Sequence, residues 1–523
     1  AQAKSVLGKL LAEQPELREN VLQLRSQVED TVEQVNKMSL AKQKAELGDL
    51  PAVEKRIEKK ELPDLERREK FVVRFAPNPD GALHLGNARP AVLCDEYAKL
   101  YKGKFILRYD DTDPKVKVPE KRYYKWIKED IAWLKIKVHE TVMASKRLSI
   151  YYKYAERLLK EDHAYVCTCN KESWKKLINQ SKSCPCRLLD PSNQMRRWKK
   201  MFSGYKEGEA VLRIKTELDA KNPAVRDWPG FRIVDRPKHS VKKKVWPLYN
   251  FASAIDDHLL GITHIFRGQE HSTNESKQRY IYQYFKWSYP YVIILGRFSL
   301  SDMVLSKSEI REGIELGKFA GWDDPRLGTI RALRRRGFVP QALKKAVLDL
   351  GIKTNDSSIE FARLANLNRG ELLEKAVPAE LLTEPVELSV QFTPKMEAHG
   401  IGISAGSQSF FVEKSEINSV KIGSVFRLKK ALNVNLLEKS GFFASGKFAG
   451  THEPGSGERK KILRWVIESV DVEILMDDGK KMLGITQYNG DLNEGDVLYF
   501  EKFGYARAEE ISPNRIKCVF AHK

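Results

Sequence analysis

Apolar positions along the chain follow one spacing before residue 67 and another after it. In residues 1–66 the apolar side chains fall near heptad a and d positions between many charged residues, which predicts a helical hairpin. This N-terminal helical appendage either packs against the rest of the protein or serves as a docking arm for RNA or a protein partner. The pattern leaves both interpretations open.

From residue 67 to 144 the pattern changes to short apolar runs separated by turn residues. Phe71 to Phe75 has the composition of a buried strand, a dense turn follows it, and Phe105 to Tyr109 is a second strand. Between the strands we expect a helix that starts near Asn87 and ends at Tyr101 to Lys104. A strand, a helix and a second strand in this order are typical of a doubly wound parallel sheet.

The rest of the chain divides into four segments. Residues 145–240 interrupt the sheet with tyrosine-rich helices, clustered cysteines and a strand over 210–215, which indicates an inserted domain. Residues 241–310 return to strands and helices, with a helix over 273–286 and a strand over 291–295, and form the second half of the sheet. Residues 311–378 are helical and basic. Short strands between Gly, Asn, Asp and Pro turns fill 379–523, which is typical of β-barrels.

Composition places this 523-residue chain among soluble multidomain proteins. Hydrophobic residues make up 42% and charged residues 31%, which excludes a disordered chain and a membrane protein. No stretch approaches the roughly 20 apolar residues of a membrane span, and the N-terminus lacks a signal-peptide pattern, so we expect a cytoplasmic protein. The net charge of +21 favours a polyanionic partner such as nucleic acid.

Four of the six cysteines lie within twenty residues of the inserted segment. They form two C-x-C pairs, Cys167 with Cys169 and Cys184 with Cys186, separated by fourteen residues. Four thiolates at this spacing suit a structural zinc ion, and reduced, metal-free cysteines are the alternative. We expect Cys94 and Cys518 to be small buried apolar residues.

Two short stretches have the chemistry of a phosphate site. Pro77 to Arg89 joins a strand to a helix through His84 and Gly86, where backbone N–H groups at a helix N-terminus, together with a histidine donor, suit an anion. Met303 to Ser308 offers Ser-Lys-Ser in a loop, which places a flexible cation where a triphosphate could bind. Each stretch alone is also compatible with an ordinary helix start or a solvated loop.

Taken together and in this order, the two stretches resemble the signatures of class I aminoacyl-tRNA synthetases. His84-Leu85-Gly86-Asn87 stands in the place of His-Ile-Gly-His, and Leu305-Ser306-Lys307-Ser308 in the place of Met-Ser-Lys-Ser. Segments 108–114, 249–258, 261–268 and 321–327 are similar to the glutamyl and glutaminyl branch, and 420–427 and 495–507 to the barrels of its archaeal and eukaryotic members. The chain departs from the signatures at Asn87, which replaces His, and at Val304-Leu305, which replaces Lys-Met.

The resemblance implies a fold and a reaction. The fold is a multidomain α/β plus β architecture with a Rossmann-type catalytic domain in two halves (67–144 and 241–310), an inserted acceptor-binding domain (145–240), a helical stem-contact region (311–378) and a C-terminal β-barrel anticodon-binding domain (379–523). The reaction is the ATP- and Mg²⁺-dependent ligation of glutamate to tRNA(Glu), with charging of tRNA(Gln) by glutamate left open, in a monomer. A glutaminyl enzyme and a catalytically silent RNA-binding relative are the alternatives.

By the same resemblance, catalysis and ATP binding fall on His84, Gly86, Asn87 and Lys307, with Pro77, Ser306 and Ser308 as further ATP contacts. Arg74 and Tyr249 would contact the substrate side chain, and Asp110 its ammonium group. Arg267 stands where glutamate enzymes carry arginine and glutaminyl enzymes do not; a salt bridge from Arg267 to Asp257 or Glu270 is the alternative. Because an unpaired buried carboxylate costs about 3–5 kcal/mol, a glutamate site needs arginines, and we favour glutamate over glutamine.

A basic run follows the Ser-Lys-Ser loop. Arg331, Arg334, Arg335 and Arg336 lie within one and a half helical turns, so they form either a solvated helix face or a surface that contacts tRNA phosphates.

Overall fold

The computed structural model divides into two compact units, Ala1–Glu61 and Leu62–Lys523, which are described separately. The structure describes residues 20–39 and seven scattered positions of the first unit; in the second it describes 62–65, 70–392, 396–398, 401–403, 406–452, 460–487 and 490–523.

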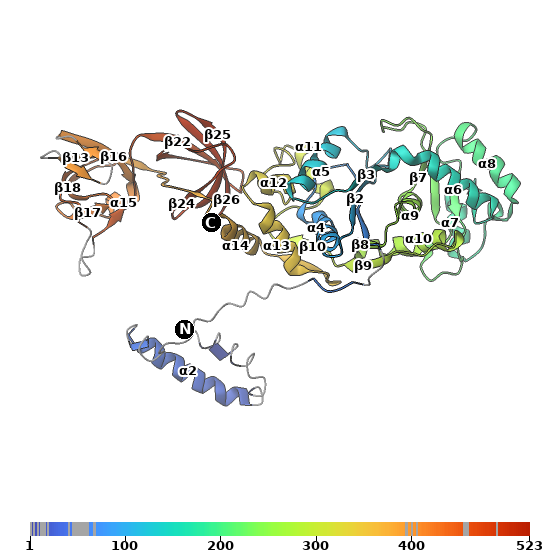
Figure 1. Cartoon of the computed structure of the whole chain (residues 1–523), viewed down its shortest axis with the longest axis horizontal. Coiled ribbons are helices and arrows are strands. Elements are labelled where there is room, and N and C mark those ends of the chain that lie inside the picture. The colour runs from blue at the N-terminus through green and yellow to red at the C-terminus, as the bar shows by residue number, and fades with distance from the viewer. Residues whose placement is uncertain are drawn as a thin grey trace. The chain divides into compact units, whose positions relative to one another are not determined.

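The first unit contains helix α2 (Val21–Lys37; Figure 1). Ion pairs one turn apart, Arg25 with Glu29 and Glu33 with Lys37, lie on its surface, and Val28 is buried. The remainder of the expected hairpin falls mostly on residues outside the described part of the chain.

A five-stranded parallel sheet forms the centre of the second unit. Its strand order is β3-β2-β1-β8-β9. Helices cover both of its faces, so β1 is buried along its whole length, as parallel strands require. The strands are β1 (Val72–Phe75), β2 (Lys104–Tyr109), β3 (Glu140–Met143), β8 (His264–Gly268) and β9 (Tyr291–Leu295).

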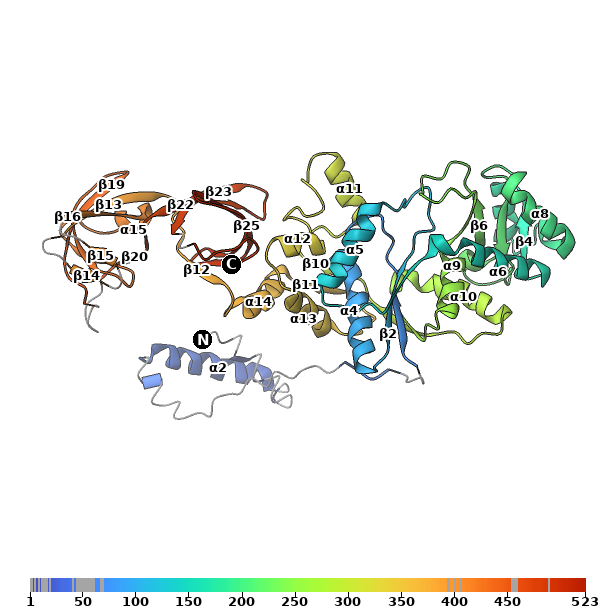
Figure 2. The same ribbon diagram turned by 45° about the horizontal axis from the view of Figure 1, so that its top comes forward.

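Alternation along the strands separates the two faces of this sheet. Val73 and Phe75 point toward the face that packs on α4 (Leu85–Leu100) and α5 (Lys121–Trp133). Arg74 and Arg108 point the other way and bond to acids of α9 (Tyr249–Leu259), because successive side chains of a strand face opposite sides. Figure 2 shows the ribbon of α9 beside the parallel sheet. Helix α10 (Ser272–Tyr284) lies beside α9.

The segment between the two halves of the parallel sheet forms its own antiparallel sheet, with order β4-β5-β6-β7. Buried aromatic side chains, among them Trp198, Trp246 and Phe231, fill its core. The elements are β4 (Ala164–Cys167), β5 (Val211–Ile214), β6 (Pro229–Ile233), β7 (Val245–Pro247), α6 (Leu148–Lys160), α7 (Lys171–Asn179), α8 (Pro191–Ser203) and the 3-10 turns η2 (Ala144–Arg147), η3 (Pro185–Leu188) and η4 (Pro223–Val225).

Helices predominate between residues 298 and 372. Strands β10 (Phe298–Leu300) and β11 (Ser357–Ile359) pair in parallel across them. The other elements are the turn η5 (Gln269–His271), which precedes this region, and the helices α11 (Lys307–Glu315), α12 (Ile330–Arg335), α13 (Pro340–Leu350) and α14 (Phe361–Leu372).

Two larger sheets, each with a separate hydrophobic core, complete the C-terminal part. One contains, in order, β12 (Val377–Ala379), β24 (Val497–Phe500), β25 (Gly504–Ser512), β26 (Arg515–His522), β22 (Ser469–Leu475) and β23 (Lys481–Gln487). The other contains β20 (Ile462–Leu463), β17 (Val425–Leu428), β18 (Asn433–Lys439), β19 (Phe443–Phe448), β13 (Pro385–Phe392), β16 (Gly406–Glu413) and β21 (Trp465–Val466). Helix α15 (Lys414–Asn418) and the hairpin β14 (Met396–Ala398) with β15 (Ile401–Ile403) are the remaining elements.

The predicted fold class, a parallel α/β sheet with an inserted domain followed by β-rich C-terminal sheets, is confirmed. The strand predicted over 291–295 has those bounds, whereas the helix predicted from near Asn87 begins two residues earlier, at Leu85. Among the described residues, no helix has both the length and the apolar character to cross a membrane.

Candidate functional site

The junction of β1 and α4 is built by a reciprocal cap. The Asn87 N–H donates to His84 Nδ1 (3.3 Å), and the His84 N–H donates to Asn87 Oδ1 (2.8 Å). Two backbone donors of the helix start are thereby satisfied, which is the logic of a capping box. Because Nδ1 of His84 accepts a hydrogen bond, the proton of the neutral ring sits on Nε2, where it can be donated to a ligand.

His84 is held in its neutral form by its surroundings. Burial, with a smaller contribution from the charge of Lys307, lowers the pKa of His84 to about 4. Gly86 leaves room for this ring, since a Cβ at that position would lie 3.1 Å from His84 Nδ1 and 3.4 Å from Phe298 Cδ1, so a larger residue would press on the ring. At neutral pH this junction therefore offers hydrogen-bond donors rather than a charge.

The Ser-Lys-Ser segment contacts the turn that follows β1. Lys307 Nζ donates to Asp80 Oδ1 (2.9 Å) and to the Asn78 carbonyl (3.1 Å). Ser306 is the N-cap of α11, and its hydroxyl lies 3.0 Å from that of Ser308. Burial lowers the pKa of Lys307, and Asp80 opposes that shift. The predicted phosphate residues of the two signatures thus lie close together, although they are about 220 positions apart in the sequence.

Arg74 is paired on the opposite face of the sheet. Its Nε and Nη2 donate to Asp257 Oδ1 and Oδ2 of α9 at 3.0 and 3.2 Å. Burial works against the guanidinium charge, but Asp257 outweighs burial and raises the pKa of Arg74. Pro77 lies at the start of the turn that follows β1, where its carbonyl accepts from the Asp110 N–H at 3.0 Å.

Asp110 belongs to a second charged network. Arg108 Nη1 donates to Asp110 Oδ1 (3.3 Å), while Arg108 Nε donates to Asp256 Oδ2 (2.7 Å). Asp256 also accepts from Arg147 and Tyr151 of the inserted segment. Burial raises the pKa of Asp110, and the positive charge of Arg108 opposes part of this shift.

Arg267 lies at the end of β8 and is only 4% exposed. Its Nη2 donates to Gln278 Oε1 (2.6 Å), an oxygen that also accepts from the Tyr289 hydroxyl (2.8 Å). Its Nη1 is buried and has no hydrogen-bond partner among the described residues. Tyr249 is the first residue of α9 and contributes to the electrostatic environment of Arg74.

Sequence reasoning missed the residues that hold these cations. The sequence did not point to Asp80, Asp256 or Gln278, and Asp257, an alternative partner for Arg267, pairs with Arg74 instead. The signal was present for one pair, because Asp256-Asp257 interrupts the apolar helix that starts at Tyr249, and two adjacent acids on a buried helix imply buried cationic partners.

The four clustered cysteines bring their sulfur atoms within 4.8 Å of one another. Cys167 and Cys184 Sγ lie 3.9 Å apart, and Cys169 and Cys186 Sγ lie 3.6 Å apart. A tetrahedral ion with Zn–S distances of about 2.3 Å needs sulfur separations of about 3.8 Å, so the donor set fits zinc. Arg197 Nη1 also donates to Cys186 Sγ (3.1 Å), which suits a thiolate.

The arginine run does not form one surface. Arg331 pairs with Glu129, and Arg335 makes two hydrogen bonds to Glu509 of β25. Arg336 is buried, and it donates to the carbonyls of Pro325, Phe520 and Ala521. Arg334 is exposed, so of the four it is the guanidinium most available to a phosphate.

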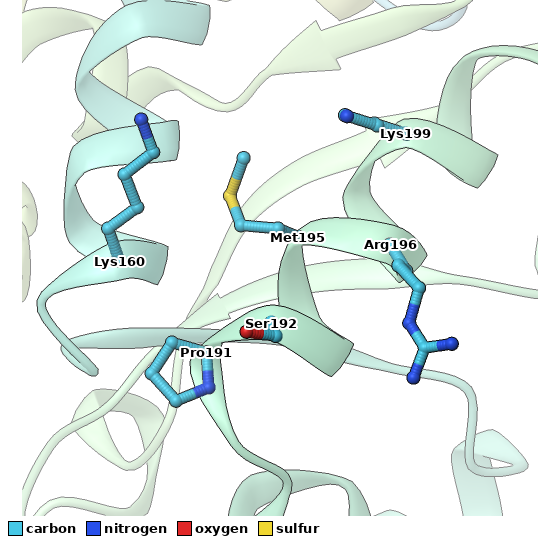
Figure 3. Close-up of a pocket in the computed structure, with 6 residues that line it drawn as sticks. All are labelled: Lys160, Pro191, Ser192, Met195, Arg196 and Lys199. Carbon is cyan, nitrogen blue, oxygen red and sulfur yellow. The ribbon is translucent and has the colours of Figure 1, made fainter.

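Two hollows lie elsewhere on the second unit. One, of about 400 Å³, lies between α6 and α8, with Lys160 facing Met195 and Lys199 across it and Arg196 at its edge (Figure 3). The other, of about 350 Å³, lies between the two C-terminal sheets and is lined by Pro378, Ala379, Glu380, Lys429, Lys430, Trp465, Gln487, Tyr499 and Glu501.

The chain resembles known proteins over its whole length. Residues 70–374 match the family described as tRNA synthetases class I (E and Q), catalytic domain. A glutamate–tRNA ligase from Pyrococcus furiosus is 45% identical over 100% of this chain and 96% of its own length, and one from Pyrococcus horikoshii is 46% identical with the same coverage. A solved glutamate-tRNA synthetase from Elizabethkingia anophelis aligns with 22% identity and a TM-score of 0.42 over 58% of this chain and 71% of that chain.

Proposed function

The chain belongs to the class I tRNA synthetases for glutamate and glutamine, and from this membership we propose that it ligates L-glutamate to tRNA(Glu) at the expense of ATP. The substrate choice follows the relatives named glutamate–tRNA ligase, which match the whole chain. As a member of this family the enzyme uses ATP.

The choice of glutamate rests on Arg267, whose guanidinium is buried and has a hydrogen-bond partner, among the described residues, on only one of its two terminal nitrogens. Its Nη2 is fixed by Gln278, whereas its Nη1 has no partner within the described chain. A buried donor without a partner is costly unless a ligand satisfies it, and a side-chain carboxylate satisfies it better than an amide because the bond is charge-assisted. Arg74 and Tyr249, across the same face of the sheet, supply further polar contacts.

In the first step an oxygen of the glutamate α-carboxylate attacks the α-phosphorus of ATP. The bond to the bridging oxygen breaks, pyrophosphate leaves and glutamyl-adenylate forms. Asp110 holds the substrate ammonium. His84 Nε2–H, the N–H groups at the starts of α4 and α11, and the Lys307 ammonium stabilise the phosphate oxygens, while Gly86 and Asn87 shape the junction. A Mg²⁺ ion bound to the triphosphate would neutralise part of its charge.

In the second step a ribose hydroxyl of the terminal adenosine of tRNA attacks the acyl carbon, the ester forms and AMP leaves. The inserted segment (145–240) is the proposed acceptor-binding domain, and its Arg147 and Tyr151 share Asp256 with Arg108 next to the amino-acid site. The helical region (311–378) and the C-terminal sheets (379–523) are the proposed tRNA stem and anticodon contacts. The enzyme acts as a monomer in the cytoplasm.

A structural zinc ion is proposed for the inserted segment. Cys167, Cys169, Cys184 and Cys186 would hold it, and the ion would fix the loop between β4 and α8 without taking part in the chemistry. Metal analysis of protein purified without a chelator should give one equivalent of zinc. Less than a tenth of an equivalent would exclude the site.

Charging of purified tRNA(Glu) and tRNA(Gln) with labelled glutamate and, separately, labelled glutamine tests the function. We expect glutamate on tRNA(Glu); glutamate on both tRNAs would identify an enzyme that does not discriminate between them. Glutamine on tRNA(Gln) would replace the proposal by a glutaminyl enzyme. Absence of pyrophosphate release with either amino acid and tRNA would point to a silent RNA-binding relative.

A further inference from the structure

Asp80 is the acidic partner of the signature lysine. Its Oδ1 accepts from Lys307 Nζ at 2.9 Å, its Oδ2 lies 3.9 Å from Arg311 Nη2, and its side chain is only 8% exposed. Both cations lie on α11, in its first and second turns. The carboxylate therefore joins the turn after β1 to the helix that carries the Ser-Lys-Ser segment.

The carboxylate is the fixed member of this pair. The turn that carries it is tied to the neighbouring loop, because the Pro79 carbonyl accepts from the Glu120 N–H at 3.1 Å. Trp322 packs so closely on Gly81 that a Cβ there would lie 2.6 Å from the indole ring. Lys307, in contrast, reaches Asp80 through a side chain with four rotatable bonds, so its ammonium can change partner without a backbone movement.

We propose that Asp80 holds the Lys307 ammonium in the ATP-free enzyme and that the triphosphate of ATP competes with this carboxylate for it. The inference rests on the ATP-binding role proposed above for Lys307. An ammonium has three N–H donors, of which Asp80 and the Asn78 carbonyl take two. One donor is left, so a triphosphate that takes more than one hydrogen bond from the ammonium must displace the carboxylate or the Asn78 carbonyl, and it brings negative charge next to Asp80.

The affinity for ATP then depends on the difference in free energy between two ion pairs of Lys307, one with the triphosphate and one with Asp80. Removing the charge of Asp80 while keeping an oxygen acceptor, as in Asp80→Asn, frees the ammonium and removes the repulsion. The KM for ATP should then fall about fivefold, the size expected for a partly buried ion pair, while kcat changes less than twofold. A residue that only supported the fold would raise KM or lower kcat when replaced.

The experiment measures ATP–pyrophosphate exchange, with glutamate and tRNA present, for the wild type, Asp80→Asn and Asp302→Asn. Asp302 is an exposed acid five residues before Lys307 with no ion pair among the described residues, so its substitution removes the same charge and should leave KM within twofold. Asp80→Ser is a second neutral variant and must also lower KM. An unchanged or raised KM in the Asp80 variant that folds overturns the inference.

Lys307→Met separates this inference from the proposed function. If Lys307→Met binds a non-hydrolysable ATP analogue as tightly as the wild type, the ATP-binding role of Lys307 fails. If Lys307→Met loses affinity and Asp80→Asn behaves as the wild type, only the competition fails. In a double-mutant cycle, Asp80→Asn should improve analogue binding less in the Lys307→Met protein than in the wild type, because no ammonium remains to be freed.

Discussion

The proposed choice of glutamate over glutamine rests on the side chain of Arg267. Replacing it by Ala removes the free Nη1 donor and leaves a substrate carboxylate unpaired in a buried site, so kcat/KM for glutamate should fall by about a thousandfold or more, equivalent to several kcal/mol. Arg267→Lys should recover only part of the loss, because an ammonium cannot form two parallel hydrogen bonds. Steady-state charging measures both.

A matched control for Arg267 is Arg363→Ala, which removes an exposed arginine paired with Asp349 in the helical region. Its kcat/KM for glutamate should stay at the wild-type value. Wild-type turnover in Arg267→Ala would remove Arg267 from the substrate site.

Asp130 of α5 makes stability depend on pH. Both carboxylate oxygens are buried without a hydrogen-bond partner among the described residues, and burial raises the pKa of Asp130 to about 7, with Arg331 opposing the shift. The unfolded group titrates near 3.9. Between these values the folded protein holds a proton that the unfolded chain has lost, so stability falls as pH rises, by at most about 1.4 kcal/mol per pH unit.

Asp130→Asn should abolish this dependence. We expect the variant to unfold at a higher temperature than the wild type at pH 8, with a smaller difference at pH 5, in thermal unfolding followed by circular dichroism. The exposed Asp302→Asn should show no such change with pH. A difference between Asp130→Asn and the wild type that is the same at both pH values would contradict the assignment.

At the scale of single residues, the sequence predicts cations better than their partners. The resemblance to the synthetase family points to Arg74 and Arg267, and its two signatures identify His84 and Lys307. The acids that hold these cations come from distant parts of the chain, as when Arg74 pairs with Asp257 183 positions away. Local spacing does not encode such pairing, since it depends on how α9 packs on the sheet.

At the scale of elements, the type and order of helices and strands can be predicted from the sequence pattern, whereas the ends of helices depend on side-chain caps. The helix predicted from near Asn87 begins at Leu85 because His84 and Asn87 exchange hydrogen bonds across its first turn. Gly86 is a poor helix former, so propensity alone places the start too late. A similar limit applies to β7, which pairs with the inserted sheet although it lies beyond the proposed boundary at residue 240.

Helix α7 should be the element most dependent on zinc. It buries only Ile178, whereas α8 buries Gln194, Trp198 and Met201. The half-buried Trp174 and Leu177 of α7 pack against the cysteine cluster, so α7 loses the surface it packs on when no ion holds that cluster together, and most helical stability comes from tertiary packing. Treatment with a chelator should therefore open tryptic sites at Lys175 and Lys176, as seen by mass spectrometry of the fragments.

The control for this experiment lies within the same protein. Lys199 and Lys200 of α8 should remain uncut after chelation, and added zinc should restore protection of α7. Equal cleavage of both helices, or no change on chelation, would contradict a structural role for the metal.

At the scale of the whole molecule, Arg336 joins the helical region to the last sheet. Its guanidinium donates to the Phe520 and Ala521 carbonyls of β26 and to the Pro325 carbonyl. Arg336→Met should leave these carbonyls without their donor, at a cost of about 1–3 kcal/mol for each one that stays buried. We expect faster proteolysis between α14 and β13 and a raised KM for tRNA, with the KM for ATP unchanged.

Arg334→Met is the matched control for stability, since it removes a neighbouring exposed arginine of the same helix. It should leave proteolysis unchanged. If Arg336→Met resists proteolysis as well as the wild type, its three hydrogen bonds do not hold the two parts together.

The charge of the whole molecule makes tRNA binding strongly dependent on salt. Residues 145–240 contain 22 basic and 11 acidic residues, so this fifth of the chain carries about half of the excess of +21. If six or more phosphates are neutralised on binding, affinity should fall by roughly a thousandfold or more between 50 and 200 mM salt. Fluorescence anisotropy with labelled tRNA measures the slope of log Kd against log salt concentration.

Arg334→Ala should reduce that slope by about one phosphate contact, whereas Lys523→Ala, at the exposed end of the last sheet, should leave it unchanged. A shallow slope in the wild type would mean that base contacts and shape, rather than phosphate neutralisation, provide most of the affinity.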